Sequence, residues 1–101
     1  MAKKPETQFR TGTVDPYLKT LKCAVDFSIQ QQTLCGHPDK ILCIRGRFVA
    51  LEIKNNDEDP APLQQYFLDE VTKKGGVAWV VKPKNWHIIK NKLHLLDEGL
   101  L

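Results

Sequence analysis

A short β-hairpin centred on Arg45-Gly46 is the structure that this sequence predicts most strongly. Hydrophobic residues lie on both sides of the dipeptide, and glycine suits a tight two-residue turn. With the turn at that position, Asp39 lies directly opposite Glu52 on the partner strand. Opposed residues share a face of the sheet, with Cβ atoms about 5 Å apart. Lys54 falls on the same face, because side chains alternate along a strand.

The length of the turn decides whether the two carboxylates can meet. A three-residue loop over 45–47 would move Asp39 and Glu52 to opposite faces, and they would then belong to an ordinary cluster of surface charges. A two-residue turn, or a four-residue loop of the same parity, keeps them together. The two-residue turn also fixes three further opposed pairs, which are Ile44 with Arg47, Cys43 with Phe48, and Ile41 with Ala50.

The predicted meeting of two carboxylates indicates a cation site. Two acidic side chains held together repel each other and lose hydration, so a fold that pairs them normally has a cation between them. Asp39 and Glu52 are expected to bind one hard divalent cation through oxygen. Lys54 beside them indicates chemistry as well as binding.

Length and composition predict one domain over residues 1–101, located in the cytoplasm. The 101 residues are too few for two hydrophobic cores, and 42% hydrophobic with 27% charged residues is ordinary for a globular protein. No apolar run approaches the roughly 18 residues that a membrane span needs, and no signal-peptide core follows the first residues. A membrane is therefore not an expected partner.

The segment 72–96 is strongly basic, with six lysines and no acidic residue. Such a segment is compatible with a phosphate-rich partner. A solvated lysine-rich surface is the alternative interpretation, and the segment alone does not favour either.

The three cysteines predict free thiols in a reducing compartment, because their number is odd and no CxxC spacing occurs. The alternative is a zinc site built from Cys23, Cys35 and Cys43 with the three histidines. No pair of these residues has zinc-finger spacing, so we do not expect zinc.

Hydrophobic patterns predict an α/β chain in the order α-β-β-β-α-β with a C-terminal helix and a mixed central sheet. The first helix begins at Pro5 and is kinked or split near Gly12 and Pro16. The first strand is predicted to bury the face that carries Val25, Phe27 and Ile29. The strands over 41–44 and 48–54 are apolar on both faces and therefore central.

The second half of the chain predicts a helix, a parallel strand and a last helix. The helix over 62–71 is predicted to bury a stripe of Leu63, Phe67 and Val71. Gly75 would end it in a left-handed conformation, and the strand over 77–81 would follow. Asn85 would cap the last helix, whose core-facing residues are Trp86, Ile89, Leu93 and Leu96.

The hairpin and its surroundings resemble the VRR-NUC branch of the PD-(D/E)xK nuclease superfamily. Pro38-Asp39 and Glu52-x-Lys54 match the motif, and the likeness extends through Gly36, the segment 45–54, Pro62-Leu63-Gln64 and Gly75-Gly76-Val77-Ala78. It covers about residues 5–96. It implies the restriction-endonuclease-like fold in a small stand-alone nuclease of the kind common in phages, acting in the cytoplasm of the host cell.

The resemblance implies an endonuclease that hydrolyses DNA phosphodiester bonds with Mg²⁺ or Mn²⁺, with structure-selective action on branched or junction DNA. Asp39 and Glu52 would be the metal ligands, together with the main-chain carbonyl of Ile53. Lys54 would position or activate the attacking water and stabilise charge on the phosphate.

Two residues outside the hairpin also match the family. Gln64 matches its glutamine near the site, and Glu6 matches the acid of its first helix, although an acid there would also compensate the helix dipole. Cys35, His37 and Lys40 depart from the family pattern. His37 is either a phosphate contact or an accidental surface residue, and Lys40 is expected at a solvated edge position, pointing away from the carboxylates.

A homodimer is the expected assembly, since one site cuts one strand. Cleaving both strands of a duplex, or resolving a junction symmetrically, would need a two-fold dimer. The alternative function is a catalytically weak nucleic-acid-binding module with a nuclease-like fold. Intact Asp39, Glu52 and Lys54 argue against that alternative.

Overall fold

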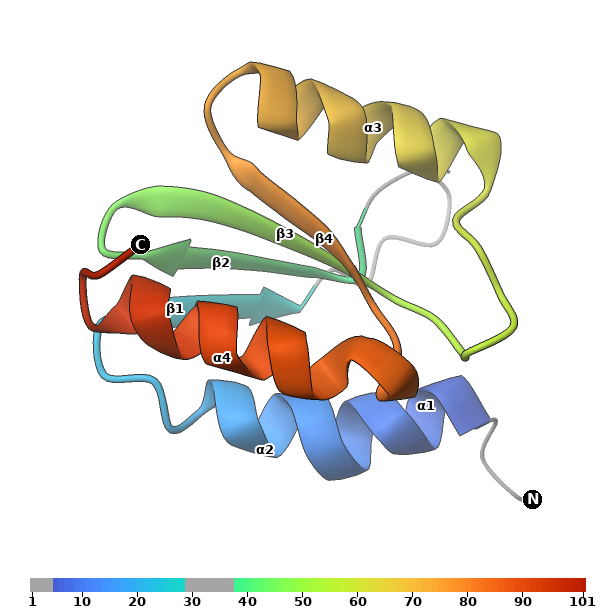
Figure 1. The fold of residues 1–101 in the computed structure, drawn as a ribbon, viewed down its shortest axis with the longest axis horizontal. Coiled ribbons are helices and arrows are strands. Elements are labelled where there is room, and N and C mark those ends of the chain that lie inside the picture. Colours follow the sequence, from blue (N-terminus) through green and yellow to red (C-terminus); the bar gives the residue numbers. More distant parts are fainter. Residues whose placement is uncertain (1–4, 29–37) are drawn as a thin grey trace.

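A computed structural model of the chain describes residues 5–28 and 38–101 (Figure 1). The elements follow the predicted order of helix, three strands, helix, strand and helix, which confirms the α/β class. The first helical segment consists of α1 (Pro5–Phe9), a π-helical turn (Arg10–Val14) and α2 (Asp15–Leu18). The later elements are β1 (Ala24–Ser28), β2 (Lys40–Ile44), β3 (Arg47–Ile53), α3 (Pro62–Lys73), β4 (Val77–Val81), a 3₁₀ turn (Pro83–Asn85) and α4 (Trp86–Asp97).

The strands form one mixed sheet in the order β1-β2-β3-β4, so the two strands predicted to be central are central. β1 and β3 each run antiparallel to β2, whereas β4 runs parallel to β3. In the β2–β3 hairpin Ile44 pairs with Arg47, and every further pair follows the predicted register. The turn has positive φ angles at Arg45 (48°) and Gly46 (83°), as a type I′ turn requires.

The sheet lies between two helical layers. α1, α2 and α4 cover one face, and α3 lies over the other (Figure 1). The main core lies on the first of these faces, where strand residues pack against the stripe of α4 formed by Ile89, Leu93 and Leu96. That stripe was predicted, and it is confirmed. The strand residues of this core are Leu42, Ile44, Val49, Leu51, Ile53 and Val81.

The first helical segment is interrupted in the region where the sequence predicts a kink. Gly12 lies in the π-helical turn, and Pro16 lies in the first turn of α2. Glycine costs helix stability and proline lacks an N–H, so one regular α-helix is disfavoured here. The segment is fixed instead by aromatic packing. Phe9 and Tyr17 contact Trp86 edge-on, with ring centroids 6.0 and 5.5 Å apart.

The burial predicted for β1 is wrong. Val25 and Phe27 are each 55% exposed on the α3 side of the sheet, and Ile29 lies outside the described residues. Ala24 and Asp26 take the face toward the main core, because they pair with Ile44 and Leu42. α3 packs on β3 and β4, so within the described ranges no helix covers the β1 side of this face.

The stripe predicted for α3 is wrong at two of its three residues, Leu63 and Phe67. Leu63 and Phe67 are 45% and 40% exposed, whereas Leu68 is buried. The helix is rotated so that Gln64, Leu68 and Val71, spaced i, i+4 and i+7, lie toward the sheet. The end of the helix was predicted correctly, since φ is 94° at Gly75.

Asn85 does not cap α4 in the predicted way. Its Oδ1 accepts the N–H of Lys82 at 2.8 Å, and its Nδ2 donates to the carbonyl of Val80 at 2.9 Å. The side chain therefore faces back toward β4 and closes the 3₁₀ turn.

Lys40 is not a solvated edge residue. It points away from the face of Asp39, as predicted, but it is only 3% exposed. Its Nζ lies 3.0 Å from Asp15 of α2 and 3.1 Å from Asp26 of β1. The two carboxylates supply the opposite charge that a buried ammonium needs, and they tie α2 to the first residue of β2.

Two expectations from composition concern membrane spans and the cysteines. No helix in the described part of the chain is long and apolar enough to cross a membrane. Cys23 and Cys43 are free, as predicted, and both are exposed, whereas Cys35 lies outside the described residues.

Candidate active site

Asp39 is held in place by the backbone of the opposite strand. It immediately precedes β2, and its Oδ2 accepts the N–H of Ile53 at 2.8 Å. This bond directs the carboxylate toward the end of β3. The side chain of Ile53 lies in the main core on the other face. Only the backbone of Ile53 therefore adjoins Asp39, as a main-chain metal ligand would require.

Glu52 lies on the α3 side of β3 and is only 1% exposed. Its Oε1 accepts a hydrogen bond from Nε2 of Gln64 at 3.3 Å and lies 3.8 Å from Nζ of Lys54. When the carboxyl is ionised, its buried Oε2 receives no hydrogen bond from the described residues. Burying an ionised oxygen without a partner is costly, so this atom marks the position where a cation or a proton is needed.

Gln64 connects the start of α3 to Glu52. Its Oε1 accepts the N–H of Ala61, the residue before the helix, at 2.8 Å, while its Nε2 donates to Glu52. Both ends of the amide are used, so the side chain has one orientation. The sequence predicted Gln64 near the site, and the rotation of α3 brings it there.

Glu6 lies close enough to the hairpin to be affected by its charges. The pKa of Glu6 is raised by burial in the first place and by the negative charge of Asp39, while Lys54 acts in the opposite direction. No hydrogen bond joins Glu6 to the hairpin within the described ranges. Glu6 therefore contributes negative charge near the site and holds none of the other groups in place.

The environment of Glu52 strongly disfavours its ionised form. The pKa of Glu52 is raised to about 9, mainly by burial, then by a hydrogen bond between the protonated carboxyl and Asp39 and by the charge of Asp39. Lys54 lowers the pKa but does not compensate. Without a cation, Glu52 is therefore protonated near neutral pH, and a metal ion that binds here must displace that proton.

These groups fit a hard divalent cation. Carboxylate and carbonyl oxygens are the ligands that Mg²⁺ prefers, and a cation would partner Glu52 Oε2 and relieve the repulsion by Asp39. Within residues 5–28 and 38–101, no three Asp, Glu, His or Cys side chains converge on one metal position. The remaining ligands would be main-chain and water oxygens, which suits Mg²⁺ because it retains several waters.

The structure brings together most of the residues that the sequence singled out. Asp39, Glu52, Lys54 and Gln64 are linked by hydrogen bonds or charge contacts, either directly or through the backbone of Ile53. Cys35 and His37 lie outside the described residues.

The sequence did not reveal the ion-pair cluster directly behind Asp39, in which Lys40 contacts Asp15 and Asp26. A lysine between apolar strand residues was the available signal. Its carboxylate partners come from two other elements and have no fixed sequence spacing.

Comparison with known proteins finds no protein-family profile that matches this chain, and no significant match among characterised proteins or solved structures.

Proposed function

We propose that this chain is a metal-dependent endonuclease with a restriction-endonuclease-like fold, belonging to the VRR-NUC branch of the PD-(D/E)xK superfamily. One observation carries the proposal. Asp39, Glu52 and Lys54 lie together at the end of the central hairpin, and Glu52 is buried with an oxygen that receives no hydrogen bond from the part of the chain that the structure describes. Charged residues with no role are normally solvated, so a buried Glu52 beside the carboxylate of Asp39 supports a metal site.

The proposed roles follow from the contacts. Asp39, Glu52 and the main-chain carbonyl of Ile53 would hold Mg²⁺ or Mn²⁺, which when bound would acidify a water and neutralise charge on the phosphate. Lys54 would orient the attacking water and stabilise the charge that develops on the phosphate oxygens. Gln64 would keep Glu52 in its binding orientation through the bond to Oε1.

DNA is the proposed substrate. The groups at the site address a phosphodiester and a cation, and none of them is arranged to read a base edge. A net charge of +3 favours association with a polyanion. Selectivity among DNA forms would then come from the shape of the substrate, with branched or junction DNA as the proposed preference.

A second copy of this chain is the proposed protein partner. Exposed apolar side chains gather on the open part of the α3 face, and a groove of about 380 Å³ lies between Phe48 and the aromatic residues of α3. Contiguous apolar surface of this kind marks interfaces. The apolar residues are Val25, Phe27, Phe48, Tyr66 and Phe67. Because Glu52 lies on the same face, a two-fold dimer would set two sites beside one interface.

The dimer has a direct test. Light scattering coupled to size-exclusion chromatography should give the mass of a dimer for the wild type and of a monomer for Phe27→Asp, which places a charge in the apolar surface. A monomeric wild type at all concentrations would contradict the proposed partner.

Cleavage of labelled DNA tests the proposed function. Branched, nicked, single-stranded and duplex DNA are incubated with the protein in Mg²⁺, Mn²⁺ or EDTA. We expect cleavage with either metal, none in EDTA, and none with Glu52→Gln or Lys54→Ala. Glu98→Gln removes an exposed carboxylate elsewhere and should retain activity. Cleavage by both site variants would refute the site, and DNA binding without any cleavage would favour the alternative of a binding module.

A further inference from the structure

A polar groove lies on the opposite side of the sheet from α3, between α2 and α4. It has a volume of about 430 Å³ and is lined by Tyr17, His87, Lys90, Asn91 and His94. The four α4 residues are spaced i, i+3, i+4 and i+7, so they share one face of the helix. Every one of them is exposed, and the lining contains no carboxylate.

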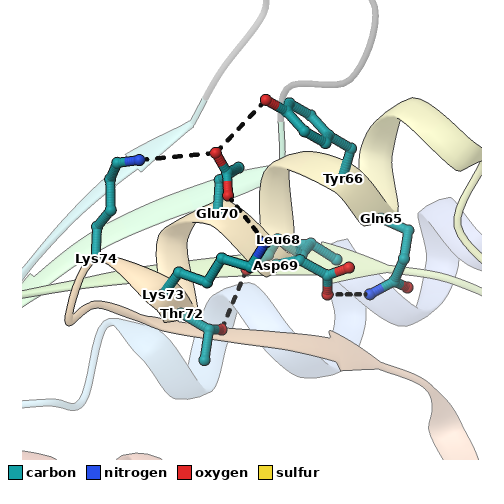
Figure 2. Close-up of polar contacts among 8 residues, drawn as sticks. All are labelled: Gln65, Tyr66, Leu68, Asp69, Glu70, Thr72, Lys73 and Lys74. Atoms are coloured by element: carbon teal, nitrogen blue, oxygen red, sulfur yellow. Dashed lines mark hydrogen bonds and ion pairs between the residues drawn. The ribbon is translucent and has the colours of Figure 1, made fainter.

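The lysines of the basic segment 72–96 differ in whether an acidic side chain lies near them. Lys73 and Lys74 approach Glu70 of α3, at 3.6 and 3.7 Å (Figure 2). Lys82 lies 3.0 Å from Asp59. These lysines are at least partly compensated by acids.

Lys90 has no such compensation. Its Nζ lies over the ring of Tyr17, 5.4 Å from the centroid, and it forms no ion pair with any described acid. Residues 1–4 and 29–37, which lie outside the described ranges, contain no Asp or Glu in their sequence. Asp97 follows His94 by one turn, but its carboxylate is buried and accepts the N–H groups of Lys22 and Cys23.

The groove therefore offers hydrogen-bond donors and positive charge beside the aromatic ring of Tyr17. An ammonium, two imidazoles and a side-chain amide all donate to phosphate oxygens. From His87 to His94 the helix rises about 10 Å, the length of a few nucleotides of backbone. The donor side chains of α4 lie in one narrow row. This arrangement suits the repeated phosphates of an extended phosphodiester better than the scattered carboxylates of an acidic protein surface.

The groove begins near the same end of the sheet as the candidate active site. Ile53, between Glu52 and Lys54, pairs with Val81 at the end of β4, and α4 starts a few residues later. The carboxylates lie on the α3 face and the groove lies on the other. A linear duplex bound at the site would leave the groove empty, whereas a branched or sharply bent substrate can pass around this end and reach both.

We propose that the groove between α2 and α4 binds the phosphate backbone of a second segment of the nucleic acid whose first segment lies at Asp39 and Glu52. This inference rests on the proposed function, because it takes the substrate of that site as its ligand. It adds a contact, centred on Lys90, that selects branched DNA over linear DNA.

The test measures DNA binding without cleavage. Fluorescence anisotropy in EDTA compares a four-way junction with a linear duplex one helical turn long, over a range of salt concentrations. Lys90→Glu is the main variant. Asn91→Asp places a carboxylate in the groove without touching the Lys90–Tyr17 contact, and Lys73→Glu is the matched control on α3. Thermal unfolding verifies that each variant is folded.

Lys90→Glu should weaken junction binding about tenfold near 0.1 M salt and reduce the slope of log K against log salt by about one, the effect of one lost phosphate contact. Asn91→Asp should act in the same direction, Lys73→Glu should change neither quantity, and binding of the short duplex should stay unchanged. Equal losses on junction and duplex, or equal effects of Lys90→Glu and Lys73→Glu, would overturn the proposal.

Inorganic phosphate distinguishes the source of the anion. Saturable phosphate binding that depends on Lys90 and that junction DNA does not displace would assign the groove to a free anion and would also overturn the proposal. Cleavage in Mg²⁺ is scored separately. A protein that binds junctions through Lys90 but cuts no DNA would refute the nuclease and leave the groove supported.

Discussion

The buried carboxyl of Glu52 predicts a specific pH dependence of folding. Replacing it by glutamine, in Glu52→Gln, keeps the shape and the acceptor for Gln64 but removes the ionisable group. The amide can also donate to Asp39, as the protonated carboxyl does. The variant should therefore resemble the protonated wild type at every pH.

The magnitude follows from the two pKa values. The pKa of Glu52 is 4.5 in the reference state and about 9 in the folded protein. A raised folded pKa means that the group's contribution to stability is fully present below 4.5 and is lost as pH rises toward 9. Each pH unit between the two values lowers the free energy of unfolding by about 1.4 kcal/mol. Between about pH 5 and about pH 7.5, the metal-free wild type should lose about 3 kcal/mol relative to Glu52→Gln.

Urea denaturation in EDTA at these two pH values measures the difference. Other titrating groups are common to both proteins, so their contributions largely cancel in the comparison. Glu98→Gln, which removes an exposed carboxylate, should follow the wild type. Curves for wild type and Glu52→Gln that stay parallel within about 0.5 kcal/mol would show that Glu52 ionises normally, and the proposed burial of Glu52 beside Asp39 would then be refuted.

Three further predictions concern the framework of the site. Lys40→Met leaves Asp15 and Asp26 without their shared cation, so the free energy of unfolding measured by urea denaturation should fall by about 3–5 kcal/mol. A fall of less than about 1 kcal/mol would mean that water already compensates the two carboxylates. The pKa of Asp97 is lowered by the N–H groups that it accepts, so its stabilising effect is lost as pH falls below the usual Asp range, and the stability difference between wild type and Asp97→Asn should shrink there. Gly46→Ala forces alanine to φ 83°, so the free energy of unfolding should fall by about 1–2 kcal/mol. An unchanged free energy of unfolding would show that the turn does not require this φ.

The sequence predicts the hairpin well because its geometry is local. Two residues at the turn determine the pairing of every residue on both strands, so Asp39 and Glu52 share a face for the same reason that Ile44 pairs with Arg47. Gly46 supplies the positive φ that the turn needs. Arg45 adopts a positive φ as well, held by its Nε–H donating to the carbonyl of Asp97 at 2.6 Å, a contact that only the fold provides.

The sequence does not predict which apolar face is covered. Leu63 and Phe67 form a better hydrophobic stripe than Gln64 and Leu68, yet α3 turns the second pair toward the sheet. Periodicity gives the width of an apolar face, whereas the position of the neighbouring elements decides the rotation. Val25 is exposed for the same reason, since the helix above the sheet packs on the strands at its other edge.

Buried charge was also beyond prediction from the sequence. Lys40 looked solvated because lysine usually is. Its partners, Asp15 and Asp26, reach it only after α2 and β1 have packed. Asp97 is similar, because it is buried at the end of α4 by backbone N–H groups at the start of β1.

The two hydrogen bonds of Gln64 make the first turn of α3 a part of the site in a dynamic sense. Helix ends open more easily than helix centres, and opening here would release the Ala61 N–H from Oε1 of Gln64 while Glu52 loses its donor. Local opening of the helix and loosening of the carboxylate are thus one event. A cation that fixes Glu52 should slow hydrogen exchange at Ala61, so one amide proton reports occupancy of the site without any substrate.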